Sequence, residues 1–283
     1  MKLNEMRECL ARHGIQLTKS LGQNFLHDAR QLERIVALAE LEREDKVLEI
    51  GPGLGPLTSR LLEKAGEVLA IEKDGRLVEI LETRLADSLK TGENRLSPHL
   101  KIMHADALHF LEKEPMDWSD WKLVSNLPYS VASPILVQLA AGPLAPRRVV
   151  ATLQLEVAQR LFARTDDDDY GILTLLIQLD FEPVEMVRIP PGCFFPPPDV
   201  ESACVALKRR PQSLIPAQLR PVFRKIVKRA FSQRRKMMLK LLKQDWPRER
   251  LEAAMLELGI SPMERAEKLG LEEFIALTQL LAA

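Results

Sequence analysis

The fold is decided by one short stretch of the sequence, Lys46-Val-Leu-Glu-Ile-Gly-Pro-Gly-Leu-Gly-Pro-Leu-Thr58. An apolar run of strand length breaks into glycines and then continues with leucines at helical spacing, which predicts a strand, a tight turn and a helix. Gly51, Gly53 and Gly55 lack the Cβ atom that would keep a ligand off the backbone, and the start of the helix offers unpaired N–H groups. Such a unit is typical of the beginning of a nucleotide-binding α/β sheet, although glycine-rich turns also occur purely for packing.

Acidic residues at the ends of the predicted strands indicate which nucleotide would fit. Glu49 would repel a pyrophosphate, and the G-x-G-x-G spacing differs from the dinucleotide pattern, so a cationic nucleoside such as S-adenosylmethionine fits better. A second strand, 67–72, ends at Glu72, whose carboxylate is suited to the two hydroxyls of a ribose. A third strand, 100–105, is followed by Asp106, which is predicted to accept from an adenine amino group or, alternatively, to cap the next helix.

The fourth predicted strand, 121–125, runs into Asn126-Leu-Pro-Tyr129. Ligands lie at the carboxyl ends of parallel strands, so this tetrapeptide is expected beside the glycine turn. An aromatic amine is a poor nucleophile because its lone pair is delocalised into the ring. The Asn126 side-chain oxygen and the Leu127 carbonyl could accept its hydrogens and favour a pyramidal nitrogen, while Tyr129 stacks on the base. A simple turn is the alternative interpretation.

Three more segments complete a seven-stranded α/β pattern. We predict strands at 147–154, 172–179 and 203–207, because each is an apolar run of strand length. The proline-rich stretch 187–202 cannot form a helix or a central strand, and is predicted to be a rigid surface element. It would display Phe194 or Phe195, which could close on the second face of a flipped base.

Composition excludes several classes of protein. Hydrophobic residues make up 46% and charged residues 28% of the 283 positions, which is ordinary for a soluble globular chain and excludes disordered and fibrous classes. No apolar run reaches the roughly 18 residues of a membrane span, and Glu5 and Glu8 argue against a targeting peptide, so a cytoplasmic location is expected. The three cysteines are odd in number and form no C-x-x-C pair, so neither a disulfide framework nor a zinc site is expected. The acidic run 166–169 is interpreted as a solvated loop and not as a metal site.

The charge of the chain is strongly segregated although its net value is zero. Residues 208–243 contain thirteen Lys or Arg and no Asp or Glu, which indicates a face for a nucleic-acid backbone; a solvated helical face is the alternative. The last 75 residues read as helices, at 219–242, 248–258, 262–269 and 271–281. We therefore predict a methyltransferase-type α/β domain at 1–208 and a small all-α RNA-contacting domain at 209–283, in a monomer because nothing suggests a coiled coil.

Taken together, these stretches make the chain resemble the ribosomal RNA adenine dimethyltransferases, most closely the bacterial type that modifies small-subunit RNA. The match runs from about residue 16 to the C-terminus. Its carriers are the segments Lys19-Ser-Leu-Gly-Gln-Asn-Phe-Leu26, Glu49-Ile-Gly-Pro-Gly-Leu-Gly55, Glu72, Asp106-Ala-Leu108, Asn126-Leu-Pro-Tyr129, Phe194-Phe-Pro-Pro-Pro-Asp-Val-Glu-Ser202 and Phe231-Ser-Gln-Arg-Arg-Lys236.

The resemblance implies a class I, Rossmann-like methyltransferase sheet with a small helical domain. It also implies transfer of two methyl groups from S-adenosylmethionine to N6 of each of two adjacent adenosines near the 3′ end of small-subunit (16S) RNA, in assembling subunits. The cofactor contacts that it implies are Asn24, Leu26, Gly51, Glu72, Asp106 and Asn126, and Gln23, Glu49 and Gly53 are predicted as further contacts. The predicted catalytic set is Asn126, Leu127, Tyr129 and Phe194.

Three departures from the family pattern fall where RNA would touch. They are the less basic Ser20-Leu21, Ile172 in place of the usual Arg, and the run 237–242 in place of an Asn-containing tail. Two alternatives remain: a large-subunit dimethyltransferase that confers macrolide resistance, and a non-catalytic RNA-binding assembly factor on the same fold. A DNA adenine methyltransferase would normally need a target-recognition region, and none is visible in the sequence.

Overall fold

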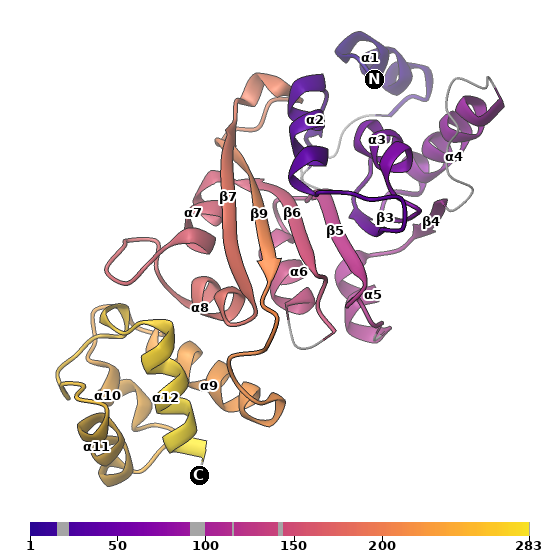
Figure 1. Ribbon diagram of the computed structural model, residues 1–283. Coiled ribbons are helices and arrows are strands. Elements are labelled where there is room, and N and C mark those ends of the chain that lie inside the picture. Colours follow the sequence, from indigo (N-terminus) through magenta and orange to yellow (C-terminus); the bar gives the residue numbers. More distant parts are fainter. Residues whose placement is uncertain (16–22, 91–99, 115, 141–143, 283) are drawn as a thin grey trace. The chain divides into compact units, whose positions relative to one another are not determined.

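The computed structural model of the chain describes residues 1–15, 23–90, 100–114, 116–140 and 144–282. Its centre is a seven-stranded sheet in the order β4-β3-β2-β5-β6-β9-β7 (Figure 1). The strands are β2 (Lys46–Ile50), β3 (Glu67–Glu72), β4 (Leu100–His104), β5 (Trp121–Asn126), β6 (Arg148–Gln154), β7 (Phe181–Ile189) and β9 (Ser202–Arg209). The pairs from β4 to β6 are parallel and β9 runs antiparallel to β6. The expected α/β class and seven-stranded sheet are confirmed.

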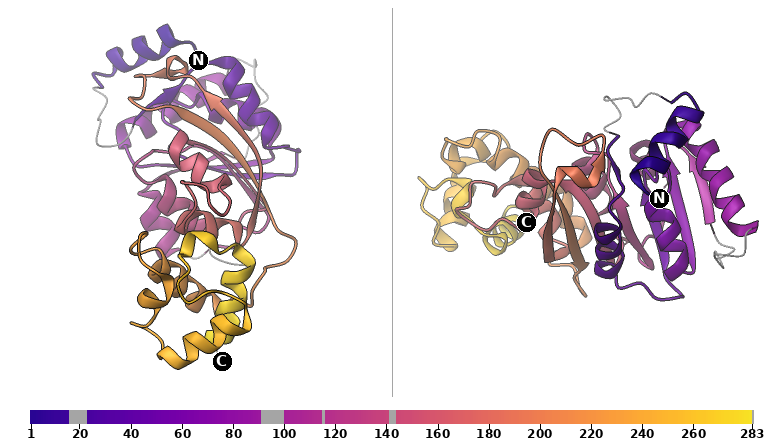
Figure 2. Two further views of the ribbon diagram at one scale, coloured as in Figure 1. Left: turned by 90° about the vertical axis from the view of Figure 1, so that its left-hand side faces the viewer. Right: turned by 90° about the horizontal axis from the view of Figure 1, so that it is seen from above.

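Helices cover both faces of this sheet (Figure 2). On one face, α2, α3 and α4 share a single apolar cluster with sheet residues such as Val47 and Val124, and α5 and α6 contact each other on the opposite face. Because both faces are covered, β2 is buried continuously from Val47 to Ile50 instead of alternating. The helices of this part are α1 (Leu3–Arg12), α2 (Ala29–Leu38), α3 (Pro56–Lys64), α4 (Gly75–Lys90), α5 (Ala107–Lys113), α6 (Ala132–Leu139) and α7 (Leu155–Phe162).

The glycine turn between β2 and α3 has the predicted strand-turn-helix form. Gly51, Gly53 and Gly55 have φ values of +70°, +58° and +79°, a region that side chains with a Cβ rarely adopt. Gly55 is the N-cap of α3 and Pro56 its first residue, where the missing N–H costs nothing. A Cβ atom on Gly53 would come within 2.4 Å of the Phe25 ring, so this glycine is required both by its backbone and by its neighbour.

Two sequence-based predictions in the second half of the sheet are wrong. The segment 172–179 is not a strand but the helix α8 (Ile172–Gln178), and the strand expected there is β7, which begins at Phe181. A short continuous apolar run does not distinguish a buried strand from a buried helix, which explains the error. The proline-rich segment also starts later than expected, because 187–189 still belong to β7.

Phe194 is not displayed at the surface. It lies in β8 (Phe194–Phe195), which pairs antiparallel with β1 (Phe25–Leu26), and its side chain is only 2% exposed within the core. Phe195 is half-buried and pairs with Phe25. The prediction of a surface Phe194 is therefore wrong. Its strand pairs with β1, about 170 residues earlier in the chain, and this pairing turns the ring inward.

The chain divides into two compact units, residues 1–158 with 183–209 and residues 159–182 with 210–283. The boundary expected at 208 and 209 thus misses one segment, 159–182, which joins the helical unit because α8 buries Leu175 in that unit's core. The remaining helices of the second unit are α9 (Arg220–Ala230), α10 (Met238–Leu242), α11 (Arg248–Glu257) and α12 (Leu271–Ala282), with the single 3₁₀ turns η3 (Ala217–Leu219) and η4 (Ala266–Lys268). The helix expected at 219–242 is interrupted, because turns at 231–237 separate α9 from α10.

Candidate active site

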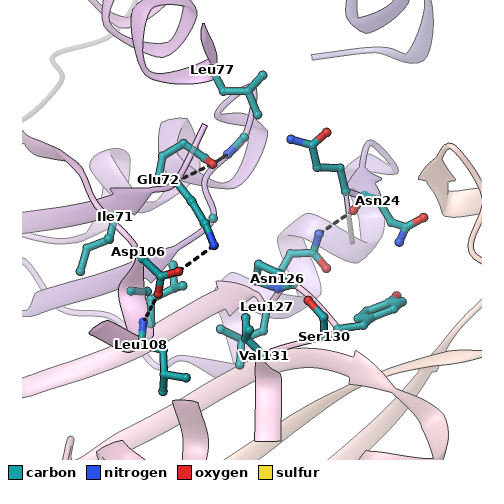
Figure 3. Close-up of a pocket in the computed structure, with 18 of the residues that line it drawn as sticks. Asn24, Ile71, Glu72, Leu77, Asp106, Leu108, Asn126, Leu127, Ser130 and Val131 are labelled. Atoms are coloured by element: carbon teal, nitrogen blue, oxygen red, sulfur yellow. Dashed lines mark hydrogen bonds and ion pairs between the residues drawn. The ribbon is translucent and has the colours of Figure 1, made fainter. Parts of the chain in front are cut away.

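A pocket of about 250 Å³ lies at the carboxyl ends of the central parallel strands. Residues that follow β2, β3, β4 and β5 all contribute to it, as the arrangement of a doubly wound sheet requires (Figure 3). Its lining includes Gln23, Asn24, Phe25, Gly51, Gly53, Glu72, Lys73, Leu77, Asp106, Leu108, Asn126, Leu127, Pro128 and Tyr129. The glycine turn and the Asn126–Tyr129 segment therefore share one cavity, as the sequence predicts.

Asn126 is the last residue of β5, and its amide is held in one orientation. The Nδ2 group donates to the main-chain carbonyl of Asn24 at 2.8 Å, and only a nitrogen can donate there. This leaves the Oδ1 atom, which is buried and has no hydrogen-bond partner among the described residues. A buried acceptor without a partner is costly in a ligand-free protein, so this atom marks a place where an N–H donor is expected to bind.

Pro128 and Tyr129 fix the rest of this segment. The Pro128 ring packs against Gly51, where an added Cβ atom would lie 3.2 Å from the proline Cγ. The Tyr129 hydroxyl and the Ser202 Oγ lie 2.6 Å apart, and burial raises the pKa of the phenol, so the ring stays neutral and anchored at its far end. The tetrapeptide is thus a rigid wall of the pocket.

Glu72 ends β3 and is 7% exposed. Its Oε2 accepts from the Gly53 N–H at 3.1 Å, and its Oε1 accepts from the N–H groups of Lys73 and Asp74 at 2.8 and 2.9 Å. Burial raises the pKa of this carboxyl, opposed by these backbone donors. A carboxylate has about four lone-pair sites, so Glu72 can accept roughly one further hydrogen bond, at Oε2. In this conformation it would bind one hydroxyl of a ribose and not both.

Both interpretations of Asp106 have support in its contacts. Its Oδ1 accepts from the N–H groups of Leu108 and His109 at the start of α5, so the residue is a helix N-cap. Its Oδ2 lies 2.7 Å from Lys73 Nζ, and this ammonium is the main reason that the pKa of the carboxyl is lowered. Since Asp106 also lines the pocket, it remains ionised and able to accept a hydrogen bond there.

Three predicted site residues lie outside the pocket lining. Leu26 and Phe194 are packed in the core at 2% exposure each, and Glu49 is buried at 1%. Burial raises the pKa of Glu49 to about 8, so this carboxyl is largely protonated at neutral pH. The side chain lies inside the protein, beneath the pocket lining and not in it. The predicted residues that do line the pocket are Gln23, Asn24, Gly51, Gly53, Glu72, Asp106, Asn126, Leu127 and Tyr129.

Sequence reasoning missed Lys73 and the apolar part of the wall. Lys73 directly follows Glu72 at a strand end, which was the available signal for it. The side chains of Leu77 and Leu108 supply apolar surface on the same side as Asp106 and Glu72 (Figure 3). Apolar walls with two carboxylates suit an adenosine, because the base needs apolar surface and its amino and hydroxyl groups need acceptors. The pocket therefore fits S-adenosylmethionine, and the described residues contain no cluster that could hold a metal ion.

The doubly wound sheet, the glycine turn and the carboxylate at the end of β3 are features of the class I methyltransferases that use S-adenosylmethionine. Comparisons with known proteins then give the family. The family model described as ribosomal RNA adenine dimethylase matches residues 14–283. The chain therefore belongs to that family, which confirms the predicted resemblance, the enzyme class and the cofactor.

Similar proteins cover almost the whole chain. It is 38% identical over 281 residues to the ribosomal RNA small subunit methyltransferase A of Geobacillus kaustophilus, covering 98% of this chain and 94% of the relative. The protein of the same name from Clostridium perfringens is 37% identical over 285 residues, with 98% and 97% covered. Among solved structures, a dimethyladenosine transferase from Plasmodium falciparum has a TM-score of 0.75 at 23% identity, covering 89% and 95% of the two chains. The 23S rRNA methyltransferase ErmE has a TM-score of 0.67 at 29% identity, covering 92% and 100%.

Proposed function

We propose that this enzyme methylates N6 of two adjacent adenosines near the 3′ end of small-subunit ribosomal RNA to give N6,N6-dimethyladenosine, using S-adenosylmethionine. We further propose that it acts as a cytoplasmic monomer on assembling small subunits. One observation carries the assignment of the site: the buried Asn126 Oδ1 has no partner in the described part of the chain, whereas its Nδ2 is fixed by the Asn24 carbonyl. Such an acceptor is what the amino group of an adenine needs. Among the described residues no helix is long and apolar enough to cross a membrane.

The residues around Asn126 would prepare the adenine amine for attack. The Asn126 oxygen and the Leu127 carbonyl would accept its two hydrogens, and the lone pair would then point away from the ring toward the cofactor side of the pocket. Tyr129, held by Ser202, would stack on the base and fix its plane. S-adenosylmethionine, when bound, would supply the electrophilic methyl group and keep the electron pair of its methyl–sulfur bond. The amine held by Asn126 and Leu127 would then lose its extra proton to solvent.

Cofactor binding would use the opposite wall of the same pocket. We assign one ribose hydroxyl to Glu72 Oε2 and the adenine amino group to Asp106, with Lys73 keeping that carboxyl ionised. Gly51 and Gly53 allow the ligand to approach the backbone of the turn, and Gln23 and Asn24 also line the pocket. The burial of Leu26 and Glu49 supports a role beneath this wall and not as direct contacts.

The similar proteins favour the small subunit over the large one. Two relatives named for the small subunit are 37–38% identical and are covered over at least 94% of their length. The enzyme named for 23S rRNA is 29% identical to this chain. The large-subunit alternative is therefore not favoured. The buried acceptor at Asn126 likewise argues against a protein that only binds RNA, because binding alone does not need it.

The charge of the second unit supports contact with RNA, with fewer free cations than the sequence suggests. Of the thirteen basic residues in 208–243, five form ion pairs with carboxylates from other segments, such as Arg220 with Asp180. In the segment 210–243, six basic side chains are exposed and have no ion pair with any residue that the structure describes: Arg224, Lys228, Arg235, Lys236, Lys240 and Lys243. These six are the ones we assign to phosphate contacts.

The test is transfer of labelled methyl groups to unmethylated small subunits, large subunits and DNA, followed by nucleoside analysis. Dimethyladenosine only with small subunits is the expected result, whereas label on large subunits or DNA would overturn the proposed substrate. Asn126→Ala should abolish transfer and affect cofactor affinity less, while the exposed Asn4→Ala serves as the matched control. Near-wild-type turnover in Asn126→Ala would contradict the assigned site. Sedimentation of the purified protein tests the monomer.

A further inference from the structure

The N-terminal helix α1 packs on residues that line the pocket. Met6 and Leu10, on its inner face, are 0% and 4% exposed. They belong to one apolar cluster with Phe25 and Leu77, two lining residues, and with Leu54 of the glycine turn. This cluster is separate from the one that joins α2, α3 and α4 to the sheet. The apolar face of α1 therefore supports the wall of the pocket and not the main core.

Contacts lead from this cluster to a predicted cofactor ligand. The Phe25 ring lies so close to Gly53 that a Cβ atom there would meet it at 2.4 Å. The Gly53 N–H in turn donates to Glu72 Oε2, the oxygen that retains acceptor capacity. Because interiors are close-packed, a change in the position of Phe25 would be transmitted to the turn and to this carboxylate.

A second contact ties the same helix to the strand pair that carries Phe25. The Arg7 guanidinium of α1 lies 5.1 Å from the centre of the Phe195 ring. Phe195 pairs with Phe25 in the β1–β8 ladder. The helix therefore packs on Phe25 itself and on the strand that pairs with Phe25.

We propose that α1 is a positioning element for the cofactor, in which Met6 and Leu10 hold Phe25 and Leu77 at the spacing that the pocket needs. The inference rests on the assignment of this pocket to S-adenosylmethionine. Removing this support should weaken cofactor binding and leave the chemistry at saturating cofactor intact, since the cluster that contains Met6 and Leu10 does not include Asn126, Leu127 or Tyr129. We expect the Kd and the KM for S-adenosylmethionine to rise about tenfold, which corresponds to roughly 1.4 kcal/mol, with kcat within about twofold.

The experiment compares the full-length wild-type protein with Met6→Ala and Leu10→Ala by calorimetric titration with S-adenosylmethionine. Glu8→Ala, on the exposed face of α1, controls for a change of the helix itself. Leu251→Ala truncates a fully buried leucine of the second unit and controls for general loss of stability. Thermal unfolding of each variant shows that it is folded at the titration temperature, and Met6→Leu, which conserves volume, should retain wild-type affinity.

Three outcomes would overturn the proposal: wild-type affinity in a folded Met6→Ala or Leu10→Ala, an equal loss in Leu251→Ala, or a wild-type protein that binds no S-adenosylmethionine. If Met6→Ala does not fold, Leu10→Ala alone decides. The titration contains no RNA, so a wrong assignment of the RNA substrate would leave its result unaffected.

Discussion

The hydroxyl groups of Tyr129 and Ser202 lie 2.6 Å apart and share a hydrogen bond. Ser202 is the first residue of β9 and is fully buried, whereas Tyr129 lines the pocket after β5. Since β9 pairs with β6 and β6 with β5, the bond ties the stacking ring to a strand two positions away in the same sheet. A ring anchored at its hydroxyl presents one face to a base without first losing rotational freedom.

Tyr129→Phe should therefore lower both stability and rate. It leaves the buried Ser202 hydroxyl without this partner, at an expected cost of about 1–3 kcal/mol, and methyl transfer to small subunits should slow about fivefold because the ring is less restrained. Adding Ser202→Ala removes the unpaired group, so the double variant should regain part of the lost stability. Urea unfolding and single-turnover transfer check the two effects. Strictly additive losses in the double variant would show that the two hydroxyls do not act together.

Gly53→Ala should be much more damaging than an ordinary glycine substitution. The new methyl would meet the Phe25 ring at 2.4 Å in a backbone with φ of +58°. We expect a loss of about 1–3 kcal/mol in the free energy of unfolding and weaker cofactor binding, because Gly53 also donates to Glu72. Gly192→Ala is the matched control, since a Cβ atom there has no heavy atom within 4 Å and the φ is not positive. Equal behaviour of the two variants in unfolding and titration would refute the steric argument.

The residues that could be predicted from the sequence are those whose position follows from strand order. Glu72, Asp106 and Asn126 each lie at or just after the end of a parallel strand, and parallel strands end at the same edge, so local patterns were enough to bring them together. The helix α8 was mistaken for a strand because its apolar run is short and continuous. Local sequence was therefore enough to place these three side chains at strand ends. It was not enough to distinguish a short buried helix such as α8 from a strand.

Pairings between distant segments could not be predicted in the same way. Phe194 is buried because β8 pairs with β1, and nothing in the proline-rich stretch specifies that partner. In the basic segment, likewise, some cations form ion pairs with carboxylates that lie far away in the sequence, such as Arg220 with Asp180. Both cases depend on tertiary contacts, which override local composition.

Stability should depend on pH through Glu49. Burial raises its folded-state pKa to about 8, against 4.5 for an ordinary glutamate, and the charge of Glu72 adds to this. The folded state thus binds this proton more tightly, so the contribution of Glu49 is present below pH 4.5 and is lost as the pH rises through about 8. The loss is on the order of a few kcal/mol.

Glu49→Gln removes this titration while keeping the shape of the side chain. Urea unfolding between pH 5 and 9 should show a smaller decline for the variant than for the wild type, and the variant should be the more stable of the two at the alkaline end. Glu72 is also raised by burial and remains in both proteins, so the difference between the two curves isolates Glu49. Parallel curves would mean that Glu49 is ionised in the folded protein throughout.

The basic residues of the second unit should separate into a structural and an RNA-binding class. Arg220 donates to Asp180 Oδ2 at 2.7 Å, and Asp180 is 5% exposed. Arg220→Ala would leave that carboxylate buried without its cation, so the free energy of unfolding should fall by about 3 kcal/mol. Lys240 is exposed, with no ion pair to any described residue, so Lys240→Ala should change stability by less than about 0.5 kcal/mol.

RNA binding should show the reverse order. Lys240→Ala should weaken binding to small-subunit RNA and reduce the slope of log K against log salt by about one, because one phosphate contact is lost. Arg220→Ala, measured at a temperature where it is folded, should leave that slope unchanged, since its guanidinium is already neutralised by Asp180. Filter binding at several salt concentrations gives both slopes. An unchanged slope for Lys240→Ala would exclude this lysine from the phosphate contacts, because an exposed cation that touches RNA must release a counterion.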